Sequence, residues 1–222
     1  MHEVNLLMSL RHPNIVTFIG FTVNKNNFFL LTEFMEKKSL KSLLDMKIDI
    51  FTIKEKINIC IDISLSLYYL HSRKPKVLHR DLKSANCLVD KNNKVKLCDF
   101  GLSKIYEISD NYTNSISTFQ WMAPEYLEQG IFTEKSDIYS LGILFWEIFM
   151  KDTVPYKGVE ENVFLLGEVN QNKRRPEFTD DFDNEIKTLI ENCWSQEPDK
   201  RPKIETIIDR LKDFLSSKYN YS

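Results

Sequence analysis

The feature that most constrains this chain is a pair of polar loops on either side of a short hairpin pattern near its middle. The first loop covers residues 79–86, and the second begins at Asp99 and continues with Phe100 and Gly101. Two short runs with β-strand character, 87–89 and 95–98, lie between the loops and flank a polar turn at 91–94. Both loops carry side chains that can be compared with the needs of a specific reaction.

Phosphoryl transfer from a nucleotide makes three demands on side chains. It needs a carboxylate to orient the attacking hydroxyl, hard oxygen ligands for magnesium, and a cation on the transferring phosphate. In the first loop Asp81 meets the first demand and Lys83 meets the third. Asn86 in the same loop and Asp99 in the second meet the demand for oxygen ligands.

The sequence His-Arg-Asp-Leu-Lys-Ser-Ala-Asn at 79–86 resembles the catalytic loop of the protein kinase family, and Asp-Phe-Gly at 99–101 resembles its magnesium loop. Either motif alone usually marks an ordinary turn or a solvated loop, but the two motifs at this spacing are specific. The resemblance implies that Asp81 is the catalytic base and that Lys83 neutralises charge on the γ-phosphate of ATP. It also implies that Asn86 and Asp99 bind Mg²⁺.

Later landmarks extend the resemblance. Trp-Met-Ala-Pro-Glu at 121–125 resembles the end of the family's activation segment, and Ser-Asp-Ile-Tyr-Ser-Leu-Gly at 136–142 resembles the start of its central buried helix. The resemblance implies a buried ion pair between Glu125 and Arg201. It also implies that Asp137 holds the backbone of the catalytic loop and that Thr118 contacts that loop.

The first 35 residues resemble the corresponding part of the small lobe in the kinase family. Glu3 precedes the Arg-His-Pro-Asn turn at the distance expected for the regulatory-helix glutamate, which pairs with a strand lysine in a complete kinase. The regulatory spine would consist of Leu7, Phe18, His79 and Phe100. An ordinary core role for Leu7 and Phe18 is compatible with that assignment. The resemblance implies nucleotide contacts at the gatekeeper Thr32, at the hinge residues Glu33, Phe34 and Met35, and at Leu88.

The Trp-Met-Ala-Pro-Glu ending, the lysine in the catalytic loop and the Leu-Arg-His-Pro-Asn-Ile-Val turn together resemble the tyrosine-kinase-like group of serine/threonine kinases. Arg80, just before the catalytic aspartate, suggests control by phosphorylation of the activation segment, because a phosphate there forms charge-assisted hydrogen bonds to arginine. Each candidate acceptor is by itself more often an ordinary hydroxyl of a polar loop. The candidates are Ser109, Tyr112, Thr113, Ser115 and Ser117.

The resemblance and the residue patterns agree on an α+β fold with two lobes. Residues 1–35 form a partial small lobe with the hinge, and residues 36–222 form a complete, mainly helical large lobe. The patterns predict a helix over the first ten residues and strands at 16–23 and 28–33. A capping box at Thr52 and Glu55 begins a long core helix that runs to about His71, with an apolar stripe from Ile53 to Tyr68. Further helices are predicted at 134–150, 160–170, 183–194 and 203–216.

No Gly-x-Gly-x-x-Gly run precedes Glu3, and no lysine-bearing strand fits into the two residues before it. We therefore expect this chain by itself to have little or no kinase activity, because those elements supply preorganised donors to the phosphates. The two predicted strands should also expose an apolar face. Two hypotheses remain open: an N-terminally truncated active serine/threonine kinase, and a non-catalytic kinase-like binding module or scaffold. The first is favoured by the intact motif residues Asp81, Lys83, Asn86 and Asp99.

Composition limits the partners and the compartment. A formal net charge of -2 with an even mix of acids and bases predicts no nucleic-acid partner. The apolar runs are shorter than the roughly 18 to 20 residues of a membrane span. Four cysteines without a Cys-x-x-Cys pair predict a cytoplasmic protein, or the cytoplasmic portion of a larger one. Cys98 is expected to be a buried inert thiol rather than a reactive one. The expected partners are ATP and a protein substrate with a serine or threonine acceptor.

Overall fold

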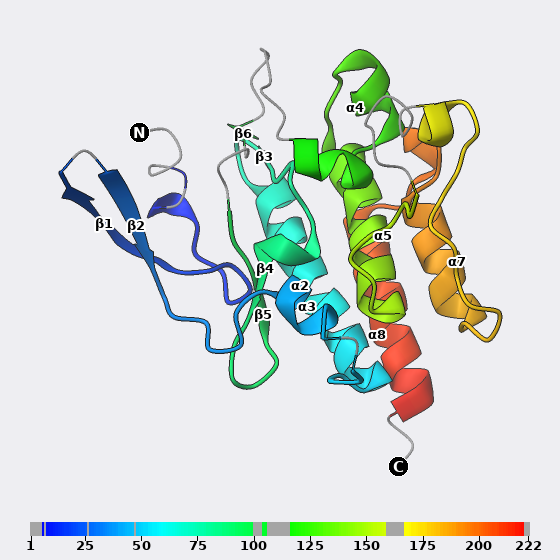
Figure 1. Ribbon diagram of the computed structural model, residues 1–222, viewed down its shortest axis with the longest axis horizontal. Coiled ribbons are helices and arrows are strands. Elements are labelled where there is room, and N and C mark those ends of the chain that lie inside the picture. Colours follow the sequence, from blue (N-terminus) through cyan, green and yellow to red (C-terminus); the bar gives the residue numbers. More distant parts are fainter. Residues whose placement is uncertain are drawn as a thin grey trace.

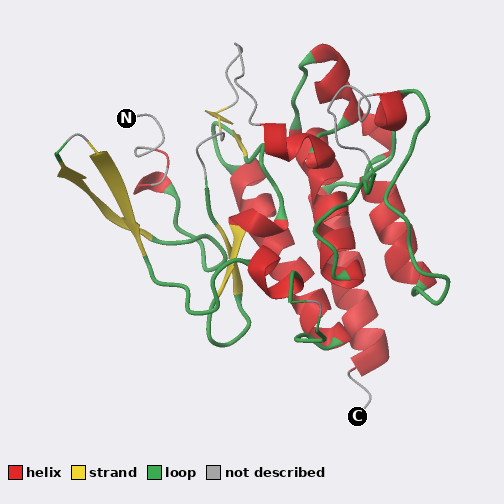
Figure 2. Cartoon of the chain, in the orientation of Figure 1, coloured by secondary structure: helices red, strands yellow, loops and turns green. Residues whose placement is uncertain are grey.

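A two-stranded antiparallel hairpin stands to one side of a mainly helical body in the computed structural model of this protein (Figure 1). The structure describes residues 6, 8–25, 27–46, 48–99, 104–105, 116–158 and 167–219. In Figure 2 the strands lie on the side of the molecule that holds the N-terminus, and helices fill the other side. The predicted α+β arrangement, with a small β-containing part and a larger helical part, is therefore confirmed.

The hairpin consists of β1 (Phe18–Asn24) and β2 (Asn27–Thr32). The strands pair from Phe18 opposite Thr32 to Asn24 opposite Asn27, with an irregularity between Phe18 and Gly20. Both strands lie close to the predicted ranges 16–23 and 28–33. Of the predicted N-terminal helix, residues 6, 8, 9 and 10 are described; residues 6, 8 and 9 are helical, and Leu10 is not.

The hairpin presents many apolar side chains to solvent. Exposed fractions between 40% and 67% are found at Ile19, Phe21, Val23, Phe29, Leu30 and Leu31. Phe18, at the base of β1, is buried at 7% exposure. The exposed apolar face that the sequence predicted is therefore present on these two strands.

The chain then enters the helical body. Helix α2 (Leu40–Leu44) was not predicted, and the Ser39 hydroxyl caps it by accepting the N–H of Ser42 at 3.2 Å. Helix α3 (Ile53–Ser72) begins at the predicted capping box. The predicted stripe is only partly right, because Ile53 and Tyr68 are 46% and 41% exposed. Because α3 packs against α5, α8 and β5, it buries residues on more of its surface than a single stripe.

Two short strand pairs lie beside α3. Strand β4 (Cys87–Val89) pairs with β5 (Val95–Leu97), and β3 (Val77–Leu78) pairs with β6 (Lys104–Ile105). The segment before β1 joins β5 through two hydrogen bonds of 2.9 Å, from Val16 N–H to Leu97 O and from Leu97 N–H to Asn14 O. These bonds connect the N-terminal part of the chain to the hairpin between the two polar loops.

The helical body is built around α5 (Glu134–Met150), in which residues 136–149 are all buried. The other elements of this part are η1 (Ser84–Asn86), η2 (Ile116–Trp121), α4 (Pro124–Gln129), α7 (Asn184–Cys193), η3 (Pro198–Lys200) and α8 (Ile204–Tyr219). A Cβ at Gly142 would lie 2.8 Å from the Cβ of Cys193, so glycine allows the close approach of α5 and α7. Of the predicted helix at 160–170, residues 167–170 are described, and they are helical.

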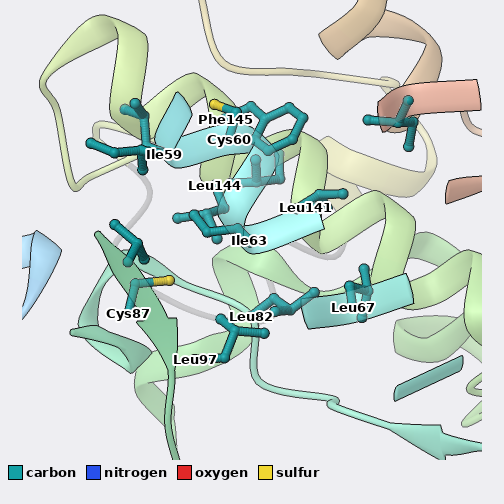
Figure 3. Packing of buried hydrophobic residues seen from close by; sticks show 14 of the residues in the cluster. Ile59, Cys60, Ile63, Leu67, Leu82, Cys87, Leu97, Leu141, Leu144 and Phe145 are labelled. Atoms are coloured by element: carbon teal, nitrogen blue, oxygen red, sulfur yellow. The ribbon is translucent and has the colours of Figure 1, made fainter. Parts of the chain in front are cut away.

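The core between α3 and α5 also supports the first polar loop (Figure 3). Leu82 lies between Asp81 and Lys83, and its fully buried side chain packs into this core. The core side chains labelled in Figure 3 are Ile59, Cys60, Ile63 and Leu67 of α3, Leu141, Leu144 and Phe145 of α5, and Leu82, Cys87 and Leu97. Among the helices in the described ranges, none combines the length and apolar character that crossing a membrane requires.

Candidate active site

One buried carboxylate holds the backbone of the loop at 79–86. Asp137 in α5 accepts the N–H of His79 through Oδ2 at 3.0 Å and the N–H of Arg80 through Oδ1 at 2.9 Å. Its Oδ2 is also 2.8 Å from Nε2 of His71, near the end of α3. Asp137 is fully buried, so these bonds take the place of its hydration. They also hold Arg80 at a φ of 70°, a left-handed conformation that is uncommon for a residue with a Cβ.

His79 connects the two polar loops. Its ring Nδ1 accepts the N–H of Asp81 at 3.3 Å, and its Nε2 lies 3.3 Å from the carbonyl oxygen of Cys98. Burial lowers the pKa of His79, so the ring is neutral near pH 7. Because Nδ1 accepts, Nε2 carries the proton and donates to the Cys98 carbonyl. His79 therefore keeps Asp81 in register with the residue before Asp99.

Asp81, Lys83 and Asn86 form one cluster in the first loop. Lys83 Nζ is 2.8 Å from Asp81 Oδ2. Asn86 Nδ2 donates to the same carboxylate oxygen at 2.7 Å and to the Asp81 carbonyl oxygen at 2.8 Å. The other carboxylate oxygen, Asp81 Oδ1, is buried and has no hydrogen-bond partner within the described part of the chain. A buried acceptor without a donor is costly, so this oxygen is a candidate contact for a bound molecule.

The second polar loop starts where β5 ends. Cys98 N–H donates to Asn86 O at 3.0 Å, which brings the start of this loop beside the end of the first. Asp99 is exposed and has a φ of 60°. Burial, followed by the neighbouring carboxylates of Asp99 and Asp81, raises the pKa of Cys98 to about 12, as expected for an inert thiol.

Oxygen atoms that suit Mg²⁺ are present in both loops. Asn86 directs its Nδ2 at Asp81, which leaves its Oδ1 for a cation, and Asp99 offers a carboxylate. In the ranges that the structure describes, no group of three or more His, Cys, Asp or Glu side chains forms a metal cage. Mg²⁺ needs no such cage, because it commonly binds one or two carboxylates together with waters and phosphate oxygens. The residues therefore fit an Mg²⁺ ion that arrives with a nucleotide.

The predicted nucleotide contacts are divided among the end of β2, the segment that follows it, and β4. Thr32 is exposed at the end of β2, Phe34 is 82% exposed, and Met35 is buried at 6% exposure. Leu88 is half-buried in β4 and forms an antiparallel bridge with Ser39. The segment 32–35 thus begins at the end of β2 with an exposed residue and ends at the buried Met35.

Glu33 fastens this segment to its neighbours. Its carboxylate is 2.7 Å from Lys96 Nζ and accepts the N–H of Thr17 at 2.7 Å. Burial acts to raise the pKa of Glu33, but the hydrogen bonds from Lys96 and Thr17 outweigh it and leave the pKa below its ordinary value. The Glu33 side chain is therefore committed to Lys96 of β5 and to Thr17.

A bidentate ion pair joins α4 to the segment before α8. Arg201 Nη1 and Nη2 lie 2.7 Å from Oε1 and Oε2 of Glu125, and the Arg201 side chain is fully buried. The Ser136 hydroxyl also donates to Glu125 Oε1 at 2.8 Å. The ion pair that the resemblance implied is present.

Several predicted positions fall outside what the structure describes. Their residues, or their side chains, are Glu3, Leu7, Phe100, Gly101, Ser109, Tyr112, Thr113, Ser115, Ser117 and Thr118. Of the predicted regulatory spine, Phe18 and His79 are described, and both are buried.

Two buried polar residues near the loops were not anticipated. Glu147 of α5 accepts the Ser84 N–H at 3.1 Å, the Ser84 hydroxyl at 2.6 Å and the Trp121 indole N–H at 2.9 Å. The other is His71, which contacts Asp137. The available signals were a single acidic residue inside the apolar run 141–149 and a histidine at the end of a core helix. Neither of these two sequence features identifies the residues that the Glu147 or His71 side chain contacts.

A cavity of about 440 Å³ lies where α3, α5 and α8 meet, and no residue of the loop at 79–86 lines it. Its walls include His71, Thr133 and Pro202. None of the site residues predicted from the sequence lines this cavity, so the cavity is not evidence for a nucleotide-binding site.

The chain is similar to known protein kinases along most of its length. Residues 1–211 match the family model for protein tyrosine and serine/threonine kinase. The serine/threonine-protein kinase CTR1 of Arabidopsis thaliana is 36% identical over 220 residues, which cover 98% of this chain and 27% of that protein. The dual specificity protein kinase shkA of Dictyostelium discoideum is 34% identical over 218 residues, which cover 96% of this chain and 41% of that protein. The probable serine/threonine-protein kinase SIS8 of Arabidopsis thaliana is 38% identical over 213 residues, or 95% and 20%. The chain spans less than half the length of each of these relatives.

Proposed function

Because this chain belongs to the protein tyrosine and serine/threonine kinase family, we propose that its two polar loops carry the transfer of the γ-phosphate of ATP to serine or threonine hydroxyls of a protein. By family it is a protein serine/threonine kinase of the tyrosine-kinase-like type. The observation that carries the proposal is Asp81 Oδ1, a buried acceptor without a partner in the described structure, next to Lys83 and Asn86.

Asp81 is the group that receives the substrate hydroxyl. Lys83 and Asn86 both bind its Oδ2, and the carboxylate is therefore held in one orientation. Oδ1 then accepts the hydrogen of the attacking hydroxyl and takes its proton as the new O–P bond forms, while the bond from the γ-phosphorus to the bridging oxygen of ATP breaks and ADP leaves. Correct positioning of the two reacting groups accounts for much of the rate in this class of reaction.

Lys83 and the oxygen ligands act on the phosphate side. The Lys83 ammonium, 2.8 Å from Asp81, would neutralise a γ-phosphate oxygen next to the base. Asn86 Oδ1 and the Asp99 carboxylate would hold Mg²⁺, which supplies neutralisation of the phosphate charge when bound. The adenine would lie against the segment 32–35 and Leu88.

The 222-residue polypeptide tested by itself should transfer phosphate slowly. No Gly-x-Gly-x-x-Gly run occurs among its residues. Loss of one preorganised donor to a developing charge commonly costs about 10² to 10³ in rate. These residues can therefore carry out the phosphoryl transfer, and its rate depends on additional protein donors that cover the phosphates of ATP.

The test is phosphoryl transfer from radiolabelled Mg²⁺·ATP to a basic protein acceptor, followed by phosphoamino acid analysis. It is run on the chain itself and on the chain preceded by the phosphate-loop and lysine strands of the Arabidopsis CTR1 relative. The second protein should label serine or threonine, and Asp81→Asn should lower its rate by about 10² to 10⁴. Asp209→Asn, an exposed position on α8, is the matched control and should leave the rate unchanged.

The same experiment also tests the remaining hypothesis, which is that the chain is a non-catalytic binding module. It is supported if the strand-completed protein binds Mg²⁺·ATP but shows no transfer that depends on Asp81. Asp99→Asn should weaken the Mg²⁺-dependent part of nucleotide binding in either case. Labelling that persists in Asp81→Asn would contradict the role given to Asp81.

We also propose a boundary between lobes after residue 35 and a cytoplasmic location. The boundary is supported by the 32–35 segment, which leads from β2 into the helical body. The location is supported by four unpaired cysteines and by the use of ATP.

A further inference from the structure

Glu147 is a buried carboxylate that contacts two segments of the proposed active site. It lies in α5 with no exposed surface, within the apolar run 141–149. Ser84, which follows Lys83 in the first polar loop, donates both its N–H and its hydroxyl to the carboxylate. Trp121, which begins the stretch 121–125, donates its indole N–H. Ser84 is 63 residues and Trp121 is 26 residues before Glu147 in the chain.

No cation compensates this carboxylate within the described structure. The charged or titratable groups that face it are Lys41 of α2 and the Cys87 thiol of β4. Lys41 is 44% exposed and pairs with Asp45 at 2.6 Å, so it does little to offset a buried charge. The three donors from Ser84 and Trp121 are therefore what stabilises the ionised form of Glu147. Burial outweighs them and raises the pKa of Glu147 to about 7.

The contacts on the Ser84 side reach the reacting groups. Ser84 begins η1, whose backbone closes through the Asn86 N–H to Lys83 O bond of 3.0 Å. Asn86 in turn donates to Asp81 Oδ2. Fixing the Ser84 N–H on Glu147 therefore fixes the turn that carries Asn86, and through it the orientation of the Asp81 carboxylate.

The contacts on the Trp121 side reach the end of the activation segment. The Trp121 carbonyl accepts the hydroxyl of Ser140 at 2.7 Å, and Ser136 donates to Glu125. Both serines belong to α5, as Glu147 does. Residues 121–125 are thus attached to α5 at three places, and Glu147 is the attachment that this stretch shares with the loop at 79–86.

We propose that Glu147 is a positioning residue, whose carboxylate holds the loop at 79–86 and the stretch 121–125 in register, and that loss of its negative charge loosens both together. This inference rests on the proposed function for its relevance to phosphoryl transfer. When ionised, the two oxygens accept all three donors. When protonated, the carboxyl has no charge, so the N–H groups of Ser84 and Trp121 no longer make charge-assisted hydrogen bonds to it, and the Ser84 hydroxyl must accept instead of donate where Oε1 carries the proton. The register should therefore tighten as the pH rises through about 7.

The test is nuclear magnetic resonance of the ¹⁵N-labelled chain between pH 5.5 and 8.5, which needs no kinase activity. The Trp121 indole N–H, the Ser84 amide and the Asn86 side-chain amide should shift with one common midpoint near pH 7. Trp146 is an internal control, because its indole donates to the backbone carbonyl of Glu177 at 2.8 Å, which does not titrate. Its signal should stay in place.

Two variants complete the experiment. Glu147→Gln should abolish the common titration, and the exposed Glu191→Gln on α7 should leave it intact. The inference is overturned if the Trp121 signal does not titrate, if it still titrates in Glu147→Gln, or if it titrates while Ser84 and Asn86 do not. If Glu147→Gln does not fold, the comparison of Trp121, Ser84 and Asn86 with Trp146 in the unchanged protein still decides. Absence of phosphoryl transfer would count against the proposed function and leave this result standing.

Discussion

Replacing Glu147 with glutamine should change how the stability of this protein depends on pH. The Glu147 carboxyl is fully buried, and burial raises its pKa from the ordinary 4.5 to about 7. A group with a higher pKa in the folded state binds its proton more tightly when folded. Its contribution to stability is therefore fully present below pH 4.5 and is lost as the pH rises through about 7. Ionisation of Glu147 thus lowers the free energy of unfolding, because burial of the charge outweighs the stronger hydrogen bonds that the ionised carboxylate accepts from Ser84 and Trp121.

The size of the effect follows from the two pKa values. The difference between 4.5 and about 7, at roughly 1.4 kcal/mol per pKa unit, corresponds to about 3 kcal/mol. Glutamine keeps the shape and one carbonyl acceptor but carries no charge at any pH. The free energy of unfolding of Glu147→Gln should therefore gain about 3 kcal/mol relative to the unchanged protein between pH 4.5 and pH 8.

The assay is urea unfolding followed by far-ultraviolet circular dichroism at several pH values, with the slope on urea checked for two-state behaviour. Glu191→Gln on α7 is exposed and serves as the control, since it removes a carboxylate without burial. Its stability should follow that of the unchanged protein at every pH. Parallel pH curves for Glu147→Gln and the unchanged protein would refute the reasoning, because they would mean that Glu147 titrates alike in the folded and unfolded states.

Three other perturbations test the fold. Glu125→Ala leaves the fully buried Arg201 without its partner and should cost about 3 to 5 kcal/mol in thermal unfolding, unlike the exposed Glu128→Ala on the same helix. Gly142→Ala forces a Cβ to within 2.8 Å of Cys193 and should cost about 1 to 3 kcal/mol, whereas Gly167→Ala meets no atom within 4 Å and should not. The double substitution Ile19→Lys and Phe29→Lys should lower light scattering by aggregates, because these two apolar side chains are 67% and 47% exposed on the hairpin. Tyr68→Lys replaces an exposed side chain on α3 and is the control, which should leave the light scattering unchanged.

Local patterns predicted many of the elements. The capping box at Thr52 and Glu55 marked the start of α3, and the bounds of α5 were predicted as they are found. Helix α2 was missed because five residues are too few for a periodic pattern to show. The stripe on α3 was drawn too narrowly, because a helix enclosed from several sides buries positions that an amphipathic pattern assigns to solvent.

The site divides in the same way. The loops at 79–86 and 99–101 could be read from the sequence because their residues are neighbours in the chain and their spacing is specific. The pair of Glu125 and Arg201 came from the resemblance alone. His71 with Asp137, and Glu33 with Lys96, are separated by more than 60 residues, and no local pattern identifies such partners.

The sequence by itself determined the family, the residues of the two polar loops and the order of most helices and strands. Only the tertiary structure decided what those loops rest on. Glu147 shows the physical reason: an acidic residue in an apolar run signals that something must satisfy it, because a buried charge is costly. Which donors satisfy it depends on α5 passing beneath both Ser84 and Trp121, and that placement is set by packing between segments far apart in the chain.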